Sequence, residues 1–452
     1  MKKIIVLSYV FILLIVALVG TTYSSPESTI LKEVTNSTNL QNVVDLIDLN
    51  EYGKAMNTLE QINGLDQQLV GYNKNKFNLL LSEYKKILIS EAQKLSDENN
   101  NTFALNLLNS KLKYYKNDES INALIAYNEN IIKSKNLVEY TGEIEHLFTH
   151  CLLAFPEQAL NPKNSMSKDY DRDCLTPTEF KRILSSLYNN NYVLIDIDSI
   201  YEVKNGITVK KKLMLPQGKK PLIFSFDDVN YDSKKKNKGM VDKIILDRNN
   251  QIATYTSKQS IAKRVSYDNE FVTIMEAFIK NHPDFSFNGA RGVINLTGYD
   301  GILGYRTQKS NATNRYEIKK ATEVVTKLKN LGWKFASHSY GHYHMKNITD
   351  MEFAKEVQNW QNEVAPIIGE TAIYVYPYGE WEVKTDNNEL SYKHKLLLDA
   401  GFKLFLGVGG KNFFGYVPIG SGENHTLLMD RKSIDGRTLR SNKVQYSHLF
   451  NC

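Results

Sequence analysis

Apolar residues recur three or four positions apart through the first third of the chain. This helical spacing runs through residues 40–47, 55–62, 77–95 and 103–115, and polar stretches separate the runs. Each run has one apolar face to bury against the others, so the spacing predicts a small all-helical domain over residues 25–139. The segment holds no candidate catalytic or metal-binding group, which favours a helical spacer.

The pattern changes near residue 140. Short apolar runs of strand length now alternate with amphipathic stretches of helical spacing. Such alternation is typical of parallel strands joined by crossover helices, and it predicts an α/β domain over residues 140–452. The expected strands cover residues 144–155, 192–195, 222–226, 292–296, 333–337, 372–376 and 402–407, and the expected helices begin at Pro177 and cover residues 318–331.

Residues 232–282 lie between two of these expected strands and are interpreted as an insertion. Two apolar runs, 244–246 and 251–255, flank the polar residues Arg248, Asn249 and Asn250, a pattern that predicts a hairpin. The lysine run 234–236 is expected to be a solvated loop.

The chain opens with Lys2 and Lys3, followed by an apolar run from Ile4 to Gly20. This order is typical of an export signal, so residues 1–24 are predicted to be a signal peptide or an uncleaved membrane anchor. Because lysines stay on the cytoplasmic side, the remainder is expected outside the cytoplasm, either tethered to the membrane or secreted to the cell wall.

Composition is that of an ordinary globular protein, with 42% hydrophobic and 23% charged residues. The formal net charge of +6 is compatible with an anionic bacterial wall and gives no sign of nucleic-acid recognition. Three cysteines are few for an exported protein, so disulfides are not expected to hold the fold. Cys151 and Cys174 are equally compatible with a disulfide and with two free thiols.

Two short stretches carry the candidate chemistry. The expected strand 222–226 runs directly into Asp227 and Asp228, although strand interiors avoid Asp and adjacent like charges repel. Such a pair indicates a bound cation or two carboxylates with different roles. Farther along, His338 and His342 are four residues apart, so on a helical turn they would share one face and bind one ion.

One of the two aspartates, together with His338 and His342, would make a ligand set of one carboxylate and two imidazoles. Three protein ligands leave coordination positions open for water, which is typical of a catalytic metal site. Each half also has a simpler explanation, a strand-ending turn for the aspartates and an ordinary surface or core pair for the histidines. Their occurrence in one chain is much more specific than either half.

These residues resemble the polysaccharide deacetylase family, also called the NodB-homology family. Its first motif reads T-F-D-D-G, and residues 225–229 read S-F-D-D-V; its second reads H-[ST]-x-x-H, and residues 338–342 read H-S-Y-G-H. Residues 374–379, Y-V-Y-P-Y-G, are similar to the third motif, R-x-P-[YF]-G. The resemblance covers residues 140–452 and implies a distorted (β/α) barrel of about seven strands, with its site at the carboxyl ends of the strands.

The chain departs from the family pattern at three places. Val229 replaces the glycine of the first motif, and Val375 stands where many members have an arginine that holds the catalytic aspartate. A clean copy of the late Leu-x-His motif, which supplies a general acid, is absent. Arg431 is the proposed substitute for the missing arginine.

The resemblance assigns roles to further residues. A divalent metal, with zinc as first choice, would be bound by Asp228, His338 and His342, and Asp227 would take a proton from water as general base. The substrate groove would be lined by Tyr376, Pro377, Tyr378 and Gly379, with a backbone N–H near Tyr378 facing the oxyanion. For the general acid, His425 is preferred over His150 and His344.

The implied activity is metal-dependent hydrolytic de-N-acetylation of an N-acetylated cell-envelope polysaccharide. Peptidoglycan N-acetylglucosamine is the first choice of polymer, and an exopolysaccharide of poly-N-acetylglucosamine is the second. Two other classes stay open: a glycan-binding pseudoenzyme, favoured by the absent motif arginine, and a different exported metal hydrolase such as an amidase or phosphoesterase. A dinuclear hydrolase would need more ligands than the sequence offers.

Overall fold

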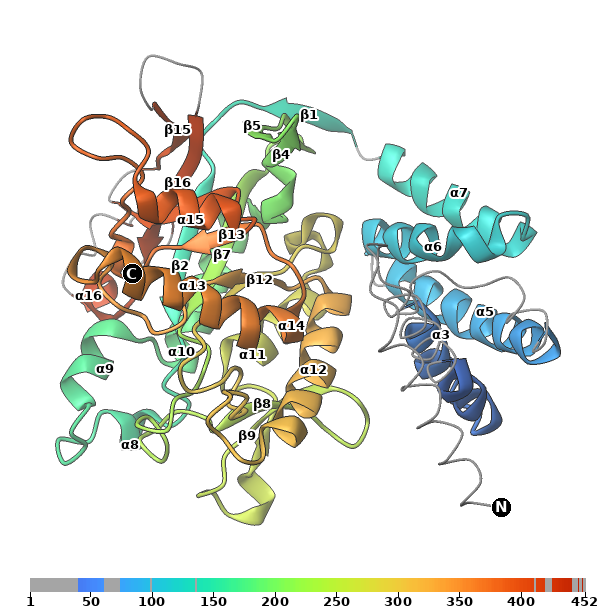
Figure 1. Ribbon diagram of the computed structural model, residues 1–452, viewed down its shortest axis with the longest axis horizontal. Coiled ribbons are helices and arrows are strands. Elements are labelled where there is room, and N and C mark those ends of the chain that lie inside the picture. Colours follow the sequence, from blue (N-terminus) through green and yellow to red (C-terminus); the bar gives the residue numbers. More distant parts are fainter. Residues whose placement is uncertain are drawn as a thin grey trace, which may run out of the picture. The chain divides into compact units, whose positions relative to one another are not determined.

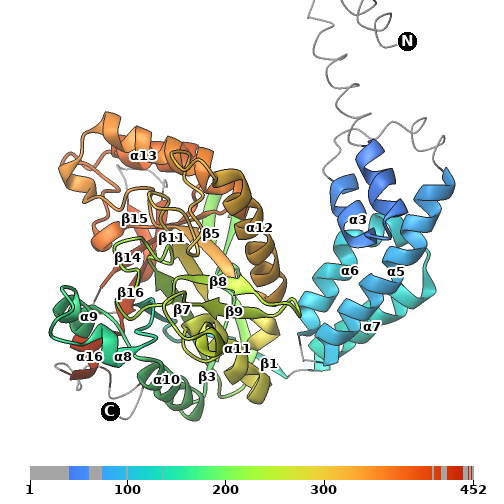
Figure 2. The same ribbon diagram turned by 90° about the horizontal axis from the view of Figure 1, so that it is seen from below.

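The computed structural model describes residues 40–60, 74–97, 100–134, 136–409, 412–418, 425–440, 446 and 449 (Figures 1 and 2). The predicted signal or anchor, residues 1–24, lies outside the described residues, as does Cys452. Within the described ranges, every helix is too short or too polar to cross a membrane.

The first part of the chain is helical, as the apolar spacing predicts. After a helix over residues 40–48 come α3 (Tyr52–Glu60), α5 (Lys74–Asp97), α6 (Asn101–Tyr115) and α7 (Glu119–Ser134). The chain divides into two compact units, Met1–Glu91 with Lys111–Ile121, and Ala92–Ser110 with Asn122–Cys452. The predicted domain boundary near residue 140 stays a prediction.

The second part contains a closed barrel of seven parallel strands, which confirms the predicted (β/α) barrel. Each strand pairs with the next around the ring, and β7 closes it by pairing with both β11 and β2. In ring order the strands are β7 (Lys220–Asp227), β11 (Val293–Leu296), β12 (Lys334–Ser337), β13 (Ile373–Val375), β14 (Leu404–Val408), β16 (His425–Ser433) and β2 (Glu145–His150).

Two further strands extend the sheet outside the ring. Strand β3 (Tyr192–Leu194) pairs with the first residues of β7, and β15 (Phe414–Pro418) pairs antiparallel with β16. The predicted helices are confirmed as α10 (Pro177–Asn189), whose Thr176 and Glu179 form a capping box, and α12 (Asn314–Leu331). The other helices of this part are α8 (Pro156–Ala159), α9 (Ser167–Asp173), α11 (Phe271–Asn281), α13 (Asp350–Glu363), α14 (Ala365–Ile368), α15 (Tyr392–Asp399) and α16 (Gly436–Arg440).

Side chains alternate between the two faces of each barrel strand, so the domain has one apolar core between the strands and the helices and another inside the barrel. On β7, Phe224 and Phe226 face outward and pack with the surrounding helices, whereas Ile223 faces the barrel interior. The interior is apolar at the amino ends of the strands, where Val293 and Leu404 contribute, and it becomes polar toward the carboxyl ends. This change of polarity places the candidate chemistry at one end of the barrel.

A small β structure covers the opposite, amino-terminal end. It comprises β4 (Tyr201–Lys204), β5 (Ile207–Lys210) and β6 (Leu213–Pro216), and β6 pairs antiparallel with β1 (Leu137–Tyr140). The side chains of Leu213 and Leu215 join the interior core, so this structure closes the barrel from below.

The predicted hairpin in residues 232–282 is confirmed as β8 (Lys243–Leu246) paired with β9 (Ile252–Tyr255). A short third strand, β10 (Val265–Ser266), pairs with the other side of β9.

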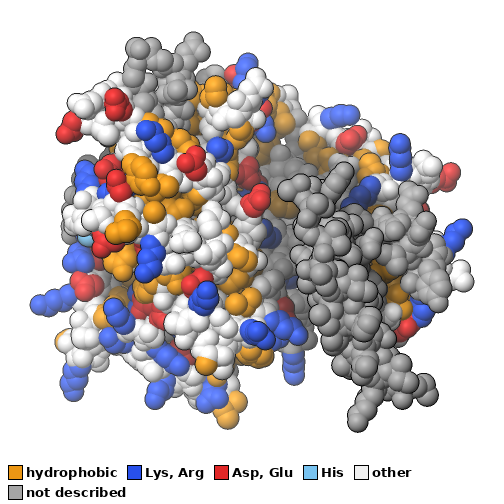
Figure 3. Space-filling model, viewed as in Figure 1, with side chains coloured by type: hydrophobic (Ala, Val, Ile, Leu, Met, Phe, Trp, Pro, Cys, Tyr) orange, Lys and Arg blue, Asp and Glu red, His pale blue; other side chains and the backbone are white. Residues whose placement is uncertain are grey.

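The lysine run 234–236 was expected to be solvated, and this expectation is wrong for Lys235. Its side chain is 18% exposed and pairs with Asp232 at 3.4 Å, because the loop turns back onto the site. On the face shown in Figure 3, basic and acidic side chains are interspersed. Cys151 and Cys174 are free and buried.

Candidate active site

The proposed site residues follow the carboxyl ends of neighbouring strands. Asp227 is the last residue of β7, Asp228 comes directly after it, and His338 comes directly after β12. Parallel strands of a barrel all end at one rim, so residues more than 100 positions apart in sequence meet there.

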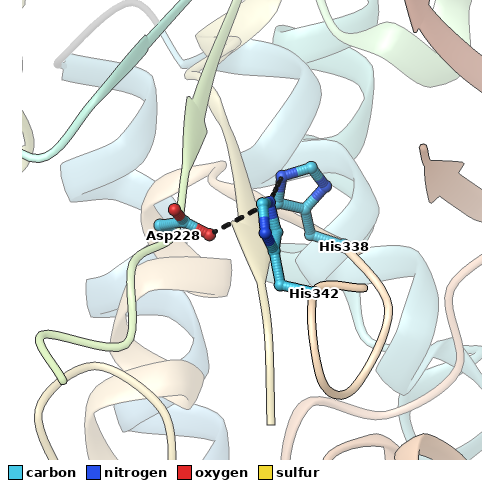
Figure 4. A group of neighbouring side chains, drawn as sticks. All are labelled: Asp228, His338 and His342. Atoms are coloured by element: carbon cyan, nitrogen blue, oxygen red, sulfur yellow. Dashed lines mark hydrogen bonds and ion pairs between the residues drawn. The ribbon is translucent and has the colours of Figure 1, made fainter. Parts of the chain in front are cut away.

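Asp228, His338 and His342 form a compact group whose ligand atoms all lie within 4.8 Å of one another (Figure 4). The Nε2 atoms of the two histidines are 3.2 Å apart, and His342 Nε2 is 3.7 Å from Asp228 Oδ1. One carboxylate oxygen and two imidazole nitrogens converging in this way suit a divalent cation such as zinc. The donor set therefore fits the metal that the sequence predicts.

The two histidines do not lie on a helical turn, contrary to the expected reason for their pairing. Residues 338–342 form a loop in which Ser339 and His342 have positive φ values of 59° and 55°. The Ser339 hydroxyl accepts a hydrogen bond from the His342 backbone N–H at 3.0 Å, and the buried Glu356 carboxylate of α13 accepts one from the Gly341 N–H. Loop hydrogen bonds thus bring the rings together.

His338 is oriented through its second ring nitrogen. Its Nδ1 donates to the backbone carbonyl of Val375 at 3.0 Å, which leaves the Nε2 lone pair for a metal. Burial lowers the pKa of His338 to about 4, so the ring is neutral at physiological pH. Val375 stands at the position of the absent motif arginine, and here its backbone supports a predicted ligand.

Asp228 has a left-handed backbone, with φ at 58°, which Asp tolerates better than most residues. Burial raises the pKa of its carboxyl group, but His342 and Lys235 outweigh burial and lower it to about 2. Asp228 is therefore ionised. Lys235 is a neighbouring cation of the site that sequence reasoning missed, because a run of three lysines gives no sign of which one is buried.

Asp227 is buried and held by side chains from two other strands. Arg431 Nη1 and Nη2 donate to its two carboxylate oxygens at 2.7 and 3.1 Å, and Asn295 Nδ2 donates to Oδ1 at 2.7 Å. Burial opposes the charge, but the Arg431 guanidinium and His338 hold the pKa of Asp227 well below its usual range. The predicted pairing of Arg431 with Asp227 is confirmed; its catalytic role stays a prediction.

Arg431 is itself fixed inside the barrel. Its guanidinium lies over the Phe148 ring, 4.3 Å from the ring centroid, and its Nε donates to the Gly407 carbonyl at 3.3 Å. Asn295 was missed by sequence reasoning. Its one signal is an amide inside the otherwise apolar strand 293–296.

The predicted groove residues separate into buried and exposed positions. Tyr376 and Pro377 are buried, and the Tyr376 hydroxyl bonds to His394 Nδ1 at 2.9 Å. Tyr378 is 54% exposed, and its ring centroid lies 4.7 Å from that of the metal-ligand candidate His342. Gly379 has φ at 70° and packs so closely on Val408 that a Cβ atom would lie 2.7 Å from the Val408 Cβ. A substrate-binding role stays a prediction for all four residues.

The three general-acid candidates occupy different places. His425 is the first residue of β16, paired with Pro418 at the amino end of the strand, and its side chain lies outside the described part of the structure. His150 is the last residue of β2 and pairs with Asp227 in the strand register. His344 stacks on Tyr378, with ring centroids 3.7 Å apart, and its Nδ1 lies 2.9 Å from Glu380 Oε1.

Comparison with solved structures finds a Streptococcus pyogenes deacetylase, PplD, in complex with acetate, at 14% identity and a TM-score of 0.35, covering 66% of this chain and 96% of that one. A Mycobacterium smegmatis protein described as a polysaccharide deacetylase is 14% identical, with a TM-score of 0.22, covering 32% and 40% of the two chains. No curated protein matches the sequence of this chain.

The family model for polysaccharide deacetylases matches residues 307–396. The matched segment contains His338, His342 and the stretch 376–379, and it follows the insertion that separates them from Asp227 and Asp228. The stretches that resemble the family's second and third motifs lie inside this match, and Asp227 and Asp228, from the stretch that resembles the first motif, lie beside them at the rim of the barrel. Residues 307–396 are therefore similar to the polysaccharide deacetylase family.

Proposed function

We propose that this protein is a metal-dependent hydrolase that removes acetyl groups from an N-acetylated polysaccharide of the cell envelope. The observation that carries the proposal is the placement of an Arg-bound carboxylate, Asp227, beside the cluster of Asp228, His338 and His342. A pseudoenzyme that only binds glycan has no use for an oriented base next to an open ligand set.

The metal would be held by Asp228 and by the Nε2 atoms of His338 and His342. A bound divalent ion supplies Lewis-acid polarisation of water and of the acetamide carbonyl. The protein prepares for it by keeping Asp228 ionised and by donating His338 Nδ1 to a carbonyl, so that both present lone pairs.

Asp227 takes the proton of the attacking water. Its carboxylate is fixed by Arg431 and Asn295, and its Oδ2 lies 3.6 Å from His338 Nε2, at the border of the ligand group. Because Arg431 and His338 keep it ionised, Asp227 accepts a proton without first having to lose one. The backbone N–H of Tyr378 faces the oxyanion in this proposal, beside His342.

Peptidoglycan N-acetylglucosamine is the proposed substrate, with poly-N-acetylglucosamine as the second candidate. The choice is supported by the export signal or anchor predicted for residues 1–24, which would keep the protein outside the cytoplasm and near the wall. A secreted exopolysaccharide would be reached equally well by a protein whose signal is cleaved.

The test is acetate release from each polymer after chelator treatment and after return of zinc. Zinc is expected to restore release, and peptidoglycan to be the better substrate. The Asp227→Asn protein should keep one metal per chain and lose about 100-fold or more of turnover, because Asn cannot accept the proton. Full activity in chelator, or near-native acetate release by Asp227→Asn, contradicts the proposed chemistry.

A further inference from the structure

The small β structure at the amino-terminal end of the barrel carries apolar side chains that face water. Four of the ten exposed large aliphatic side chains in the described residues belong to it, and each is more than 40% exposed: Val138, Val203, Ile207 and Met214. Leu213 and Leu215 of the same structure are buried in the barrel interior. Exposed apolar groups are informative where several gather, because such surfaces mark contacts with a partner.

Two of these side chains stand at the tip of the β4–β5 hairpin, which we define as residues 203–207. The turn is formed by Asn205 and Gly206, whose positive φ values of 52° and 79° are those of a tight two-residue turn. Val203 pairs with Thr208 in the strand register, so Val203 and Ile207 point to opposite faces of the hairpin. All residues of the hairpin tip are exposed.

The base of the hairpin is fixed to the barrel. Tyr201 is buried in the interior core. The Ile200 carbonyl accepts a hydrogen bond from the Lys211 N–H at 2.9 Å, and the Lys210 N–H donates to the Tyr416 hydroxyl of β15 at 3.0 Å. The tip is therefore presented on a rigid support, and little conformational freedom is lost when it binds.

The chain around the hairpin tip is basic. Residues 200–220 contain six lysines and one acidic residue, Glu202. Lys204 pairs with Glu202 and Lys212 with Glu139, both at 2.8 Å. Exposed pairs of this kind contribute little energy, so their lysines can turn to another anion. The other carboxylates near the base of the hairpin, Asp196 and Asp198, are already paired with Lys334.

Aliphatic side chains flanked by lysines match a surface that has anionic groups above an apolar layer. We propose that the hairpin tip binds the surface of a membrane that contains anionic phospholipid. Val203 and Ile207 enter the boundary between headgroups and acyl chains, and the lysines bind lipid phosphates. An anionic polymer would engage the lysines alone and leave the aliphatic groups in water. This inference goes beyond the proposed deacetylase function and does not rest on it.

Binding through the hairpin tip orients the barrel. The β structure that carries the tip closes the amino ends of the barrel strands, whereas Asp228 and His338 follow the carboxyl ends. A membrane contact at the tip therefore turns the rim with the candidate metal ligands away from the bilayer. The site then faces the side from which an extracellular polymer would approach.

The test places an environment-sensitive dye at the hairpin tip of the full-length protein. Cys151 and Cys174 are buried, so Asn205→Cys in a Cys452→Ser background gives one labelling site. In vesicles of phosphatidylcholine with phosphatidylglycerol, the emission should shift to the blue and spin-labelled lipid should quench it. The matched control is Asn250→Cys, at the exposed turn of the β8–β9 hairpin with a φ of 58°, where the dye should show neither change. The dye reports on the tip itself, whatever else attaches the protein to the vesicle.

Two double variants separate the apolar contribution from the electrostatic one. Val203→Ser with Ile207→Ser should remove the quenching at position 205, because these two side chains supply the insertion. Lys211→Gln with Lys212→Gln should lower the ratio of inserted to free tip about 25-fold, since each lysine near an anionic surface contributes about a factor of five. All four positions are exposed, so the circular dichroism of both variants should match that of the native protein.

Four results would overturn the proposal. The first is a dye at position 205 that stays unquenched with the protein on the vesicles, or a protein that does not bind them. The second is equal quenching at positions 205 and 250, which means adsorption without orientation. The third is a blue-shifted dye without vesicles, which means that protein covers the tip. The fourth is native quenching in the Val203 and Ile207 double variant with loss in the lysine variant, which would assign the surface to a polyanion.

Discussion

The Asp227 carboxylate receives hydrogen bonds from side chains on two other strands, Arg431 on β16 and Asn295 on β11. A planar guanidinium that binds both oxygens fixes the plane of the carboxylate as well as its charge. The barrel interior thus supplies the support that the Val375 side chain, at the usual arginine position, cannot give.

At this residue we predict that Arg431→Lys lowers turnover on the order of 10- to 100-fold and leaves the metal content unchanged. Lysine keeps the charge but loses the two-point contact with Asp227 and the flat contact with Phe148, so the base is oriented less well. Steady-state acetate release, with metal analysis of the same samples, measures both. A matched control is Arg437→Lys, which changes an exposed arginine paired with Asp173. If the Arg431→Lys protein has native turnover, Arg431 does not orient the base and has only a structural role.

Residue chemistry was the easiest part to predict from sequence. Asp228, His338 and His342 were identified because an Asp-Asp pair after an apolar strand and a spaced histidine pair occur together in one chain, a combination that is much more specific than either half. Asn295 and Glu356 were not, since a single amide or a single glutamate has many ordinary uses, and only the folded structure shows which group each one contacts.

The loop that carries the two histidines depends on helix α13 behind it. Glu356 is 7% exposed, and its carboxylate accepts from the Gly341 N–H between the two ligands. The left-handed residues Ser339 and His342 are held in place by such bonds rather than by a regular helix.

We therefore predict that Glu356→Ala weakens metal affinity about 10-fold, as loss of a supporting contact around a metal site commonly does. Glu356→Gln keeps an acceptor oxygen and should retain most of the affinity. Competition with a chromophoric chelator measures both variants. Glu352→Ala, an exposed carboxylate that caps the same helix, controls for loss of helix stability. Equal affinity in Glu356→Ala and the native protein contradicts the role of this contact.

Helices and strands were predicted correctly where their apolar runs are long. They were missed where polar or charged residues of the site interrupt the run. Strand β16 was not predicted because its second half, Asp430–Arg431–Lys432, is charged, although Arg431 and Lys432 are buried against Asp227 and Glu145. Helices α11 and α13 were not predicted either. The sequence pattern shows burial only for apolar residues, so a barrel strand that lines a polar site lacks the usual signal.

A buried histidine links three elements and makes stability depend on pH. His394 of α15 bonds to the Tyr376 hydroxyl after β13 and to the Thr426 hydroxyl on β16, both at 2.9 Å, and burial lowers its pKa to about 4. Between pH 6.5 and about 4 the unfolded chain binds a proton that the folded chain does not, so the free energy of unfolding falls as pH falls through this range.

The full effect of His394 corresponds to about 3 kcal/mol, present above pH 6.5 and lost by about pH 4. We predict that His394→Gln, which does not titrate in this range, reduces the loss of stability between pH 7.5 and pH 5. Urea unfolding of both proteins in excess chelator removes the contribution of metal binding. His344→Gln, at an exposed position, is the control. An unchanged pH dependence in His394→Gln contradicts this assignment.

At the scale of the whole molecule, the barrel is completed by a strand from far upstream in the sequence. Strand β2 precedes β7 by 70 residues and yet fills the gap between β16 and β7, so the ring closes only with residues from both ends of the domain. The alternation of elements predicted a barrel, but it did not predict this order, because strand pairing depends on contacts between distant segments.

The pairing of β1 bears on where a fragment that tests the predicted catalytic domain should begin. Residue 140 was chosen where the apolar pattern changes, but β1 (Leu137–Tyr140) pairs with β6, whose Leu213 and Leu215 close the barrel interior. A cut at residue 140 would remove β1 and leave the edge of β6 unpaired. We therefore choose residue 136 as the first residue of a test fragment that keeps this strand pair.

We predict that the fragment 136–452 folds, binds metal and deacetylates soluble N-acetylglucosamine oligomers, since all proposed ligands and the base lie within it. The fragment 142–452, which lacks β1, should be less stable by on the order of 2 kcal/mol because it loses the backbone hydrogen bonds to β6. Urea unfolding followed by circular dichroism compares the two, with residues 25–452 as reference. If 136–452 is unfolded while 25–452 is folded and active, helices before residue 136 belong to the catalytic unit, as the grouping of Ala92–Ser110 with the barrel residues allows.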